Sequence, residues 1–298
     1  MDFLTLLARI ADLSPATTFP SDVSARRTAL TRLGQAGAAV LPPVLAALPS
    51  LADAKVLNNS TILDAIKLAL TLEYLESEFY TRALALPNAT TFFGSAENRN
   101  AIQTIATHEN QHVALLQRLL TEAGAVIPAK PNFDFTGSKN GAQSALYPDV
   151  FTNLDTFLKV AQLLEDAGVR AYKGQVEFLV SDNYLLEAFV RTHSTEARHA
   201  SHIRTMRRQR GAVVKSWVSP SDAAITTAGS TPDKAYAGEA TTAQYTPGPR
   251  VVPFETTLPI NVGDPLLNRE ALLAKVAEAF DEPVDAATAT ELAQLFIY

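Results

Sequence analysis

Two copies of one short motif constrain the fold of this chain more than any other feature: a Glu followed three residues later by a His. The first copy is Glu109 with His112, and the second is Glu196 with His199. Residues three apart lie on one face of a helix, so each pair points a carboxylate and an imidazole in the same direction. Both pairs fall on the apolar stripe that a helix normally buries. Because unpaired buried carboxylates are unstable, we predict that a metal ion neutralises these groups.

Each motif helix follows a helix that carries a Glu and, seven residues later, a Tyr on its apolar stripe. These residues are Glu73 and Tyr80 in the first half of the chain, and Glu165 and Tyr172 in the second half. The apolar period predicts the four helices at about residues 61–85, 97–123, 150–180 and 184–210. The chain therefore contains the same helical pair twice.

The connections between these helices indicate how they are arranged. The Pro- and Gly-rich segment 125–149 is long for a joint between neighbouring helices, which usually takes about 2–8 residues. It suits a crossover along the length of a bundle. We therefore expect an all-α fold with a four-helix bundle and one long crossover at residues 58–210. An N-terminal helical segment would precede it, and a C-terminal extended arm with two terminal helices would follow at 211–298.

A Glu from each of two helices, with a Glu-x-x-His pair from each of the other two, forms a known dimetal site in four-helix bundles. Four ionised carboxylates and two neutral imidazoles have a net charge of −4, which two divalent ions cancel. The predicted metal ligands are Glu73, Glu109, His112, Glu165, Glu196 and His199. Two further histidines, His108 and His193, cannot both face the metals, and we expect them at the surface or behind the ligands.

Three more residues on the same stripes are weaker candidates. Glu76 is either an extra ligand or a replacement for Glu73, and the seven-residue spacing to Tyr80 favours Glu73. Tyr80 and Tyr172 are either hydrogen-bonded core tyrosines or donors to the ligating carboxylates. The sequence leaves these alternatives open.

Composition excludes several other functions. The chain has 298 residues, no cysteine and a formal charge of −6. The absence of cysteine excludes disulfides, thiolate zinc sites and iron–sulfur clusters. The basic cluster at residues 204–210 suits a helix end, where cations complement the helix dipole, so we expect no nucleic-acid partner. No apolar run reaches the ~20 residues that span a bilayer, so we expect no membrane span.

Residues 1–57 leave the localisation open. A pair of arginines at 26 and 27, an apolar run at 33–48 and an Ala-Asp-Ala sequence at 52–54 resemble a twin-arginine export signal. Two prolines at 42 and 43 interrupt the apolar run. The alternative is an N-terminal helical pair in a cytoplasmic protein.

These motifs carry a family resemblance. Residues 60–210 resemble the ferritin-like superfamily of di-iron carboxylate proteins, and the segments 72–80 and 279–283 resemble its desiccation-related family in bacteria and plants. The resemblance implies that Glu109 and Glu196 bridge two metal ions. It implies that Glu73 and His112 complete the coordination of one ion, and that Glu165 and His199 complete that of the other. Oxygen-rich ligation with one imidazole per metal suits iron, or alternatively manganese.

The leading functional hypothesis is a dimetal protein that reacts with O₂ or H₂O₂, as an oxidase, a peroxidase-type enzyme or a ferroxidase-like stress protein. One alternative is iron binding without turnover. Another is a structural, desiccation-related bundle that keeps the metal for stability. The sequence leaves the oligomeric state open, and a homo-oligomer is among the expectations.

Overall fold

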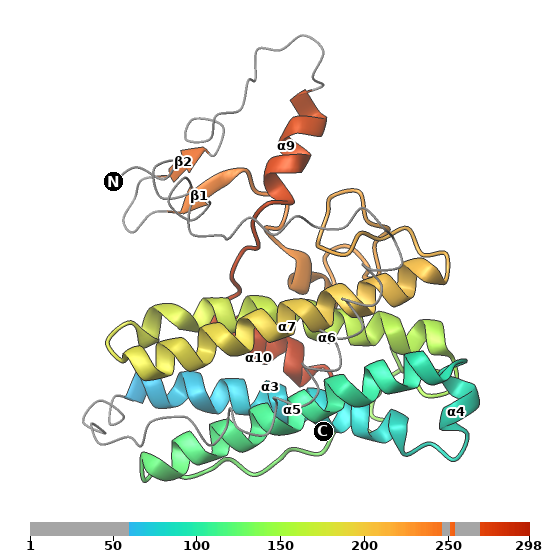
Figure 1. The fold of residues 1–298 in the computed structure, drawn as a ribbon, viewed down its shortest axis with the longest axis horizontal. Helices are drawn as coiled ribbons and strands as arrows, with labels where there is room; N and C mark the ends of the chain where they lie inside the picture. The colour runs from blue at the N-terminus through green and yellow to red at the C-terminus, as the bar shows by residue number, and fades with distance from the viewer. Residues whose placement is uncertain (1–59, 246–250, 254–268) are drawn as a thin grey trace, which may run out of the picture. The chain divides into compact units, whose positions relative to one another are not determined.

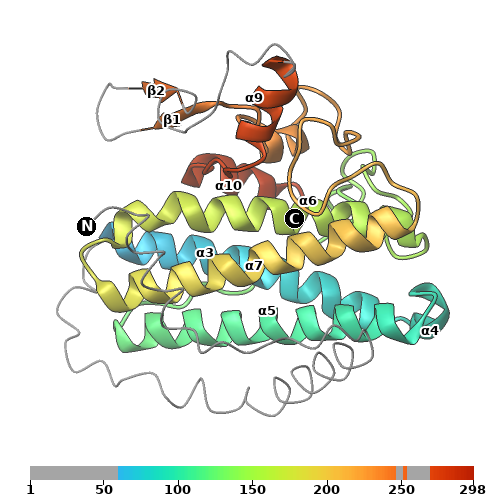
Figure 2. The same ribbon diagram turned by 45° about the horizontal axis from the view of Figure 1, so that its top comes forward.

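The computed structural model describes residues 60–245, 251–253 and 269–298. The predicted N-terminal helical segment or export signal lies outside the described residues. Four long helices are present: α3 (Ser60–Leu84), α5 (Ala96–Glu122), α6 (Leu154–Gln175) and α7 (Asn183–Gln209). Helix α3 packs on α5 and α6 packs on α7, and the two pairs meet through α3 with α6 and α5 with α7 (Figures 1 and 2). The predicted four-helix bundle with one long crossover is confirmed.

Side-chain caps set the starts of three of these helices. Ser95 accepts a hydrogen bond from the backbone of Asn98 at the start of α5, and Asp182 caps α7 in the same way. Helix α6 begins four residues later than the predicted Val150, because the side chain of Asn153 accepts hydrogen bonds from the first backbone N–H groups. A short helix that the sequence did not indicate, α4 (Ala89–Phe92), lies between α3 and α5.

The long crossover between α5 and α6 is fastened to the C-terminus of the chain. Phe133 and Phe135 are buried, and Phe135 packs against Phe296. The backbone N–H of Asp134 donates to the carbonyl of Phe296 at 2.7 Å, and that of Tyr298 donates to the carbonyl of Asn132 at 3.2 Å. The apolar C-terminal residues therefore dock on the crossover.

The C-terminal arm contains more regular structure than expected. Strands β1 (Ala243–Tyr245) and β2 (Val251–Pro253) form an antiparallel pair, and η2 (Pro232–Tyr236) is a turn of 3₁₀ helix. Two helices end the chain, α9 (Arg269–Ala277) and α10 (Ala286–Gln294), and α10 packs on α3 and α6 (Figure 2). Among the described residues, no helix has the length and apolar character needed to cross a membrane.

A buried arginine ties the arm to the bundle. The guanidinium of Arg170 on α6 donates to the carbonyls of Ala235 at 2.5 Å, Ala237 at 2.6 Å and Glu282 at 2.6 Å. One turn further on, Gly174 lets the chain approach closely: a Cβ there would lie 1.9 Å from the carbonyl oxygen of Val284. Arm and terminal segment are therefore part of the same packed unit as α6.

Candidate metal centre

All six predicted ligands meet in the middle of the bundle. They come from four helices: Glu73 from α3, Glu109 and His112 from α5, Glu165 from α6, and Glu196 and His199 from α7. The four carboxylates are 0% exposed. Two groups of four side chains have ligand atoms within 4.8 Å of one another, and both groups contain Glu109 and Glu196.

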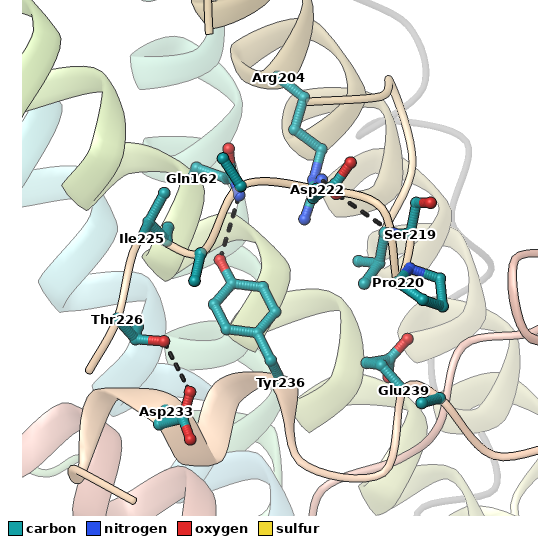
Figure 3. Close-up of a pocket in the computed structure, with 14 residues that line it drawn as sticks. Gln162, Arg204, Ser219, Pro220, Asp222, Ile225, Thr226, Asp233, Tyr236 and Glu239 are labelled. Carbon is teal, nitrogen blue, oxygen red and sulfur yellow. Dashed lines mark hydrogen bonds and ion pairs between the residues drawn. The ribbon is translucent and has the colours of Figure 1, made fainter. Parts of the chain in front are cut away.

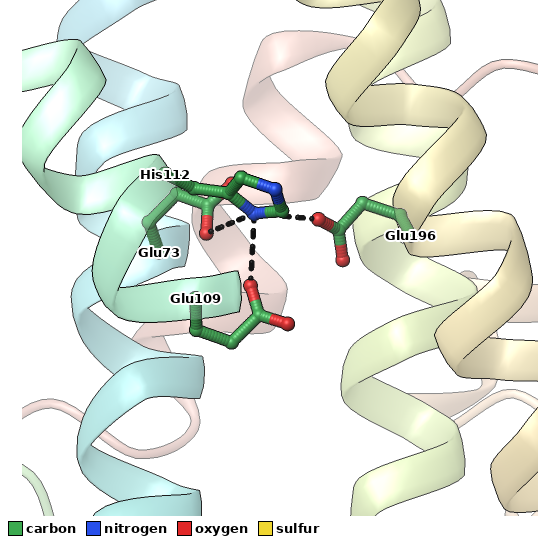
Figure 4. Close-up of side chains that lie close together, drawn as sticks. All are labelled: Glu73, Glu109, His112 and Glu196. Carbon is green, nitrogen blue, oxygen red and sulfur yellow. Dashed lines mark hydrogen bonds and ion pairs between the residues drawn. The ribbon is translucent and has the colours of Figure 1, made fainter. Parts of the chain in front are cut away.

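The two shared carboxylates divide their oxygens between the two imidazoles. Nδ1 of His112 lies 3.1 Å from Oε2 of Glu109 and 3.0 Å from Oε1 of Glu196 (Figure 4). Nδ1 of His199 lies 2.7 Å from Oε1 of Glu109 and 3.7 Å from Oε2 of Glu196. Each shared carboxylate thus presents one oxygen to each side of the cluster, which is the arrangement of a bridging ligand.

The remaining two carboxylates each belong to one side. Oε2 of Glu73 lies 3.3 Å from Nδ1 of His112, and Oε2 of Glu165 lies 3.5 Å from Nδ1 of His199. The cluster is therefore two similar halves, each with one imidazole, one carboxylate of its own and two shared carboxylates.

Many buried polar atoms of the cluster lack hydrogen-bond partners. They are Oε2 of Glu73, Glu76 and Glu165, Oε1 of Glu109, both carboxylate oxygens of Glu196, and Nδ1 of His199. Buried polar atoms in folded proteins are nearly always satisfied, and each unsatisfied one costs about 1–3 kcal/mol. Buried oxygen and nitrogen atoms that converge without hydrogen-bond partners fit a pair of cations, so the donor set passes this test for a dimetal centre.

The pKa shifts show which groups of the cluster hold protons, and so offset its negative charge, when no metal ion is bound. Burial raises the pKa of Glu109 to about 7 and that of Glu165 to about 8. Burial also opposes charge on Glu196, but its contacts with His112 and His199 outweigh this effect and lower its pKa. Despite burial, the carboxylate of Glu165 and its neighbours raise the pKa of His199 to about 12. Metal binding must therefore release protons.

A fifth carboxylate, that of Glu76, lies beside the cluster. It is 3% exposed, and burial together with the charge of Glu196 raises its pKa well above the usual range. Gly168 on α6 leaves space for the Glu76 carboxylate, because a Cβ at position 168 would lie 3.0 Å from Oε1 of Glu76. Glu73, rather than Glu76, is in the group of converging ligand atoms.

Two tyrosines exchange hydrogen bonds between the halves of the bundle. Tyr80 on α3 donates to Oε1 of Glu165 on α6, and Tyr172 on α6 donates to Oε1 of Glu73 on α3. Burial raises the pKa of both phenols well above the usual range, so both stay protonated donors. Of the two alternatives that the sequence left open, the structure supports donation to the clustered carboxylates.

The sequence allowed a position for His108 behind the ligands but did not identify the residue that it contacts. Nδ1 of His108 lies 2.9 Å from Nε2 of His199, and the planes of the two rings, whose centroids are 5.2 Å apart, differ by 14°. The signal was present, because His108 precedes His112 by four residues and so lies on the same face of α5. His193 instead contacts the carbonyl of Val169 through Nδ1.

A separate pocket of about 190 Å³ lies between α6, α7 and the arm (Figure 3). Tyr236 lines the pocket and donates to Asp166 at 2.8 Å, and Arg204, another lining residue, pairs with Asp166 and Asp222. The basic cluster at residues 204–210 ends α7, as the sequence predicts, but Arg204 within it is only 1% exposed. The charged groups lining the pocket have partners within the chain, including Glu239 with Arg170. The pocket therefore lacks the unsatisfied atoms that distinguish the carboxylate cluster.

The sequence of the four long helices matches the model of a known protein family. The family model described as a ferritin-like domain matches residues 61–209, which is 149 of the 298 residues and covers all four long helices. A comparison with curated proteins finds no match.

Proposed function

The chain belongs to the ferritin-like domain family, and from this premise we propose that it is a dimetal carboxylate protein with iron, or alternatively manganese, in the bundle. The observation that carries the proposal is the division of the oxygens of Glu109 and Glu196 between the two imidazoles. A carboxylate that only needed to be neutralised would pair with one histidine. Two carboxylates that each face both histidines suit two cations side by side.

The ligand assignment follows from the same distances. Glu109 and Glu196 would bridge the ions, His112 and Glu73 would complete one position, and the opposite histidine and carboxylate would complete the other. Hard carboxylate oxygens with one imidazole per ion favour iron or manganese over copper or structural zinc. Four carboxylates and two divalent ions leave no net charge in a site with no exposed carboxylate.

The protein's own groups would orient the ligands and exclude water. Tyr80 and Tyr172 each hold one oxygen of a carboxylate and leave the other oxygen for a metal ion. A bound pair of redox-active ions would supply electrons to O₂ or H₂O₂, which is the chemistry of an oxidase, a peroxidase-type enzyme or a ferroxidase-like protein.

Metal binding without turnover is the second candidate. The full burial of the four carboxylates, beneath a terminal segment that packs on α3 and α6, favours a metal that is kept rather than used. In that case the chain would be an iron-binding or structural protein of the desiccation-related kind, which the sequence around Glu73 resembles.

Oxygen consumption after anaerobic loading with Fe(II) separates the two candidates. We expect the wild-type protein to consume O₂ faster than the same concentration of free Fe(II), and to do so again when Fe(II) and a reductant are added. The Glu109→Ala, Glu196→Ala double variant should behave as free Fe(II). A matched control is Glu187→Ala, which removes an exposed carboxylate of α7. Tightly bound iron without oxygen consumption would refute the enzyme and leave the structural candidate.

A further inference from the structure

Among the residues that the structure describes, both ring nitrogens of His199 have neighbours, whereas only one ring nitrogen of His112 does. Nδ1 faces the carboxylates, with Oε1 of Glu109 at 2.7 Å. Nε2 lies 2.9 Å from Nδ1 of His108, and the planes of the two rings differ by 14°. A hydrogen bond between the two rings therefore lies directly behind the face that would bind metal.

The direction of this hydrogen bond follows from ligation. A neutral imidazole that binds a metal through Nδ1 must carry its proton on Nε2, so His199 is the donor. Nδ1 of His108 is then the acceptor, and the proton of His108 resides on Nε2. Partners of this kind fix the tautomer and the ring orientation of a metal ligand and increase its basicity.

The other half of the cluster lacks this support. Three carboxylates surround Nδ1 of His112, but the structure gives its Nε2 no partner among the residues it describes. The position equivalent to His108 in the second motif is Thr195, and its hydroxyl donates to the carbonyl of Arg191 at 3.1 Å. The two halves of the chain therefore differ at this position, because only the first half has a histidine there.

We propose that His108 is a positioning residue that holds His199 in the tautomer and orientation for metal binding, so that the position formed by Glu165 and His199 binds its ion more tightly than the position formed by Glu73 and His112. This inference rests on the proposed dimetal centre. It adds that the two positions are unequal and fill in order.

Titration of the metal-free protein with Co(II), followed by calorimetry and by the visible absorption of the bound ion, tests the inference. His108→Phe keeps a planar aromatic ring but removes the acceptor, and it should weaken the tighter of two binding events by ~10–100-fold. His108→Asn places an amide oxygen close to the position of Nδ1 and should restore wild-type affinity. The matched control is His202→Phe, because His202 is an exposed histidine of α7.

Each outcome has one interpretation. Two binding events in His108→Phe with wild-type affinities would overturn the role of His108 and leave the dimetal centre intact. Equal weakening of both events would overturn the assignment to the His199 position. Failure of the wild-type protein to bind Co(II) would overturn the dimetal centre and this role with it. Circular dichroism of the metal-free variants identifies a folding defect, and His108→Ala, which also removes the acceptor, tests the proposal if the Phe variant does not fold.

Discussion

Replacement of Arg204 by Met tests how much its buried ion pairs with α6 and with the arm stabilise the fold. Nε and Nη2 of Arg204 donate to the two oxygens of Asp166 at 2.9 and 2.5 Å, and Nη1 donates to Asp222 at 2.7 Å. The side chains of Arg204 and Asp166 are 1% and 2% exposed. Arg204→Met would therefore leave a fully buried carboxylate without its cation.

Loss of one partner of a buried ion pair costs about 3–5 kcal/mol. For domains of about 150–250 residues, 1 kcal/mol lowers the melting temperature by about 2–4 °C, so we expect Arg204→Met to melt roughly 6–20 °C lower. The matched control is Arg210→Met near the end of the same helix. Arg210 pairs with Asp155, but these side chains are 38% and 58% exposed, and an exposed pair contributes about 0–1 kcal/mol.

Urea and thermal unfolding, followed by circular dichroism in a buffer with chelator, measure both variants without a contribution from bound metal. A second variant, Arg204→Met with Asp166→Leu, should recover part of the loss, because it removes the unpaired charge as well. Equal destabilisation by Arg204→Met and Arg210→Met would refute the reasoning that burial determines the contribution of these pairs.

Three further predictions concern the cluster and its surroundings. Tyr172→Phe removes the donor to Glu73 and should weaken metal binding by ~10–100-fold in a chelator competition assay; unchanged affinity would exclude the orienting role. Gly174→Ala puts a Cβ against the backbone of Val284 and should release the terminal segment, detected as faster proteolysis there, at a cost of about 1–3 kcal/mol or more; wild-type resistance would contradict this packing. A carboxyl whose pKa is raised on folding, such as that of Glu165 at about 8, stabilises the fold at low pH and loses this effect as the pH rises through its folded pKa. The metal-free protein should therefore melt at lower temperature as the pH rises from about 6 to 9, and a melting temperature that rises over this range would show that the sign is wrong.

Helical periodicity accounts for most of what the sequence predicts correctly. The positions of Glu109, His112, Glu196 and His199 on buried stripes follow from a spacing of three residues, and the structure brings all four together. Local rules suffice here, because each pair is fixed within a single helix. Their service as metal ligands stays a prediction.

Contacts between distant segments could not be predicted in the same way. Arg170 meets the arm more than sixty residues away in the sequence, and the hydrogen bond between the rings of His108 and His199 joins α5 to α7. Such contacts depend on how helices pack after they form. No periodic pattern within one helix encodes the partner of Arg204, so the sequence predicted the basic end of α7 but not the burial of this arginine.

Metal content tests the central claim most directly. Protein loaded anaerobically with Fe(II) and then desalted should contain about two iron ions per chain by elemental mass spectrometry. The Glu109→Ala, Glu196→Ala double variant lacks both shared carboxylates and should contain almost none, whereas Glu187→Ala should match the wild type. Wild-type protein without iron, or a double variant with as much iron as the wild type, would contradict the assignment of a dimetal centre to this cluster.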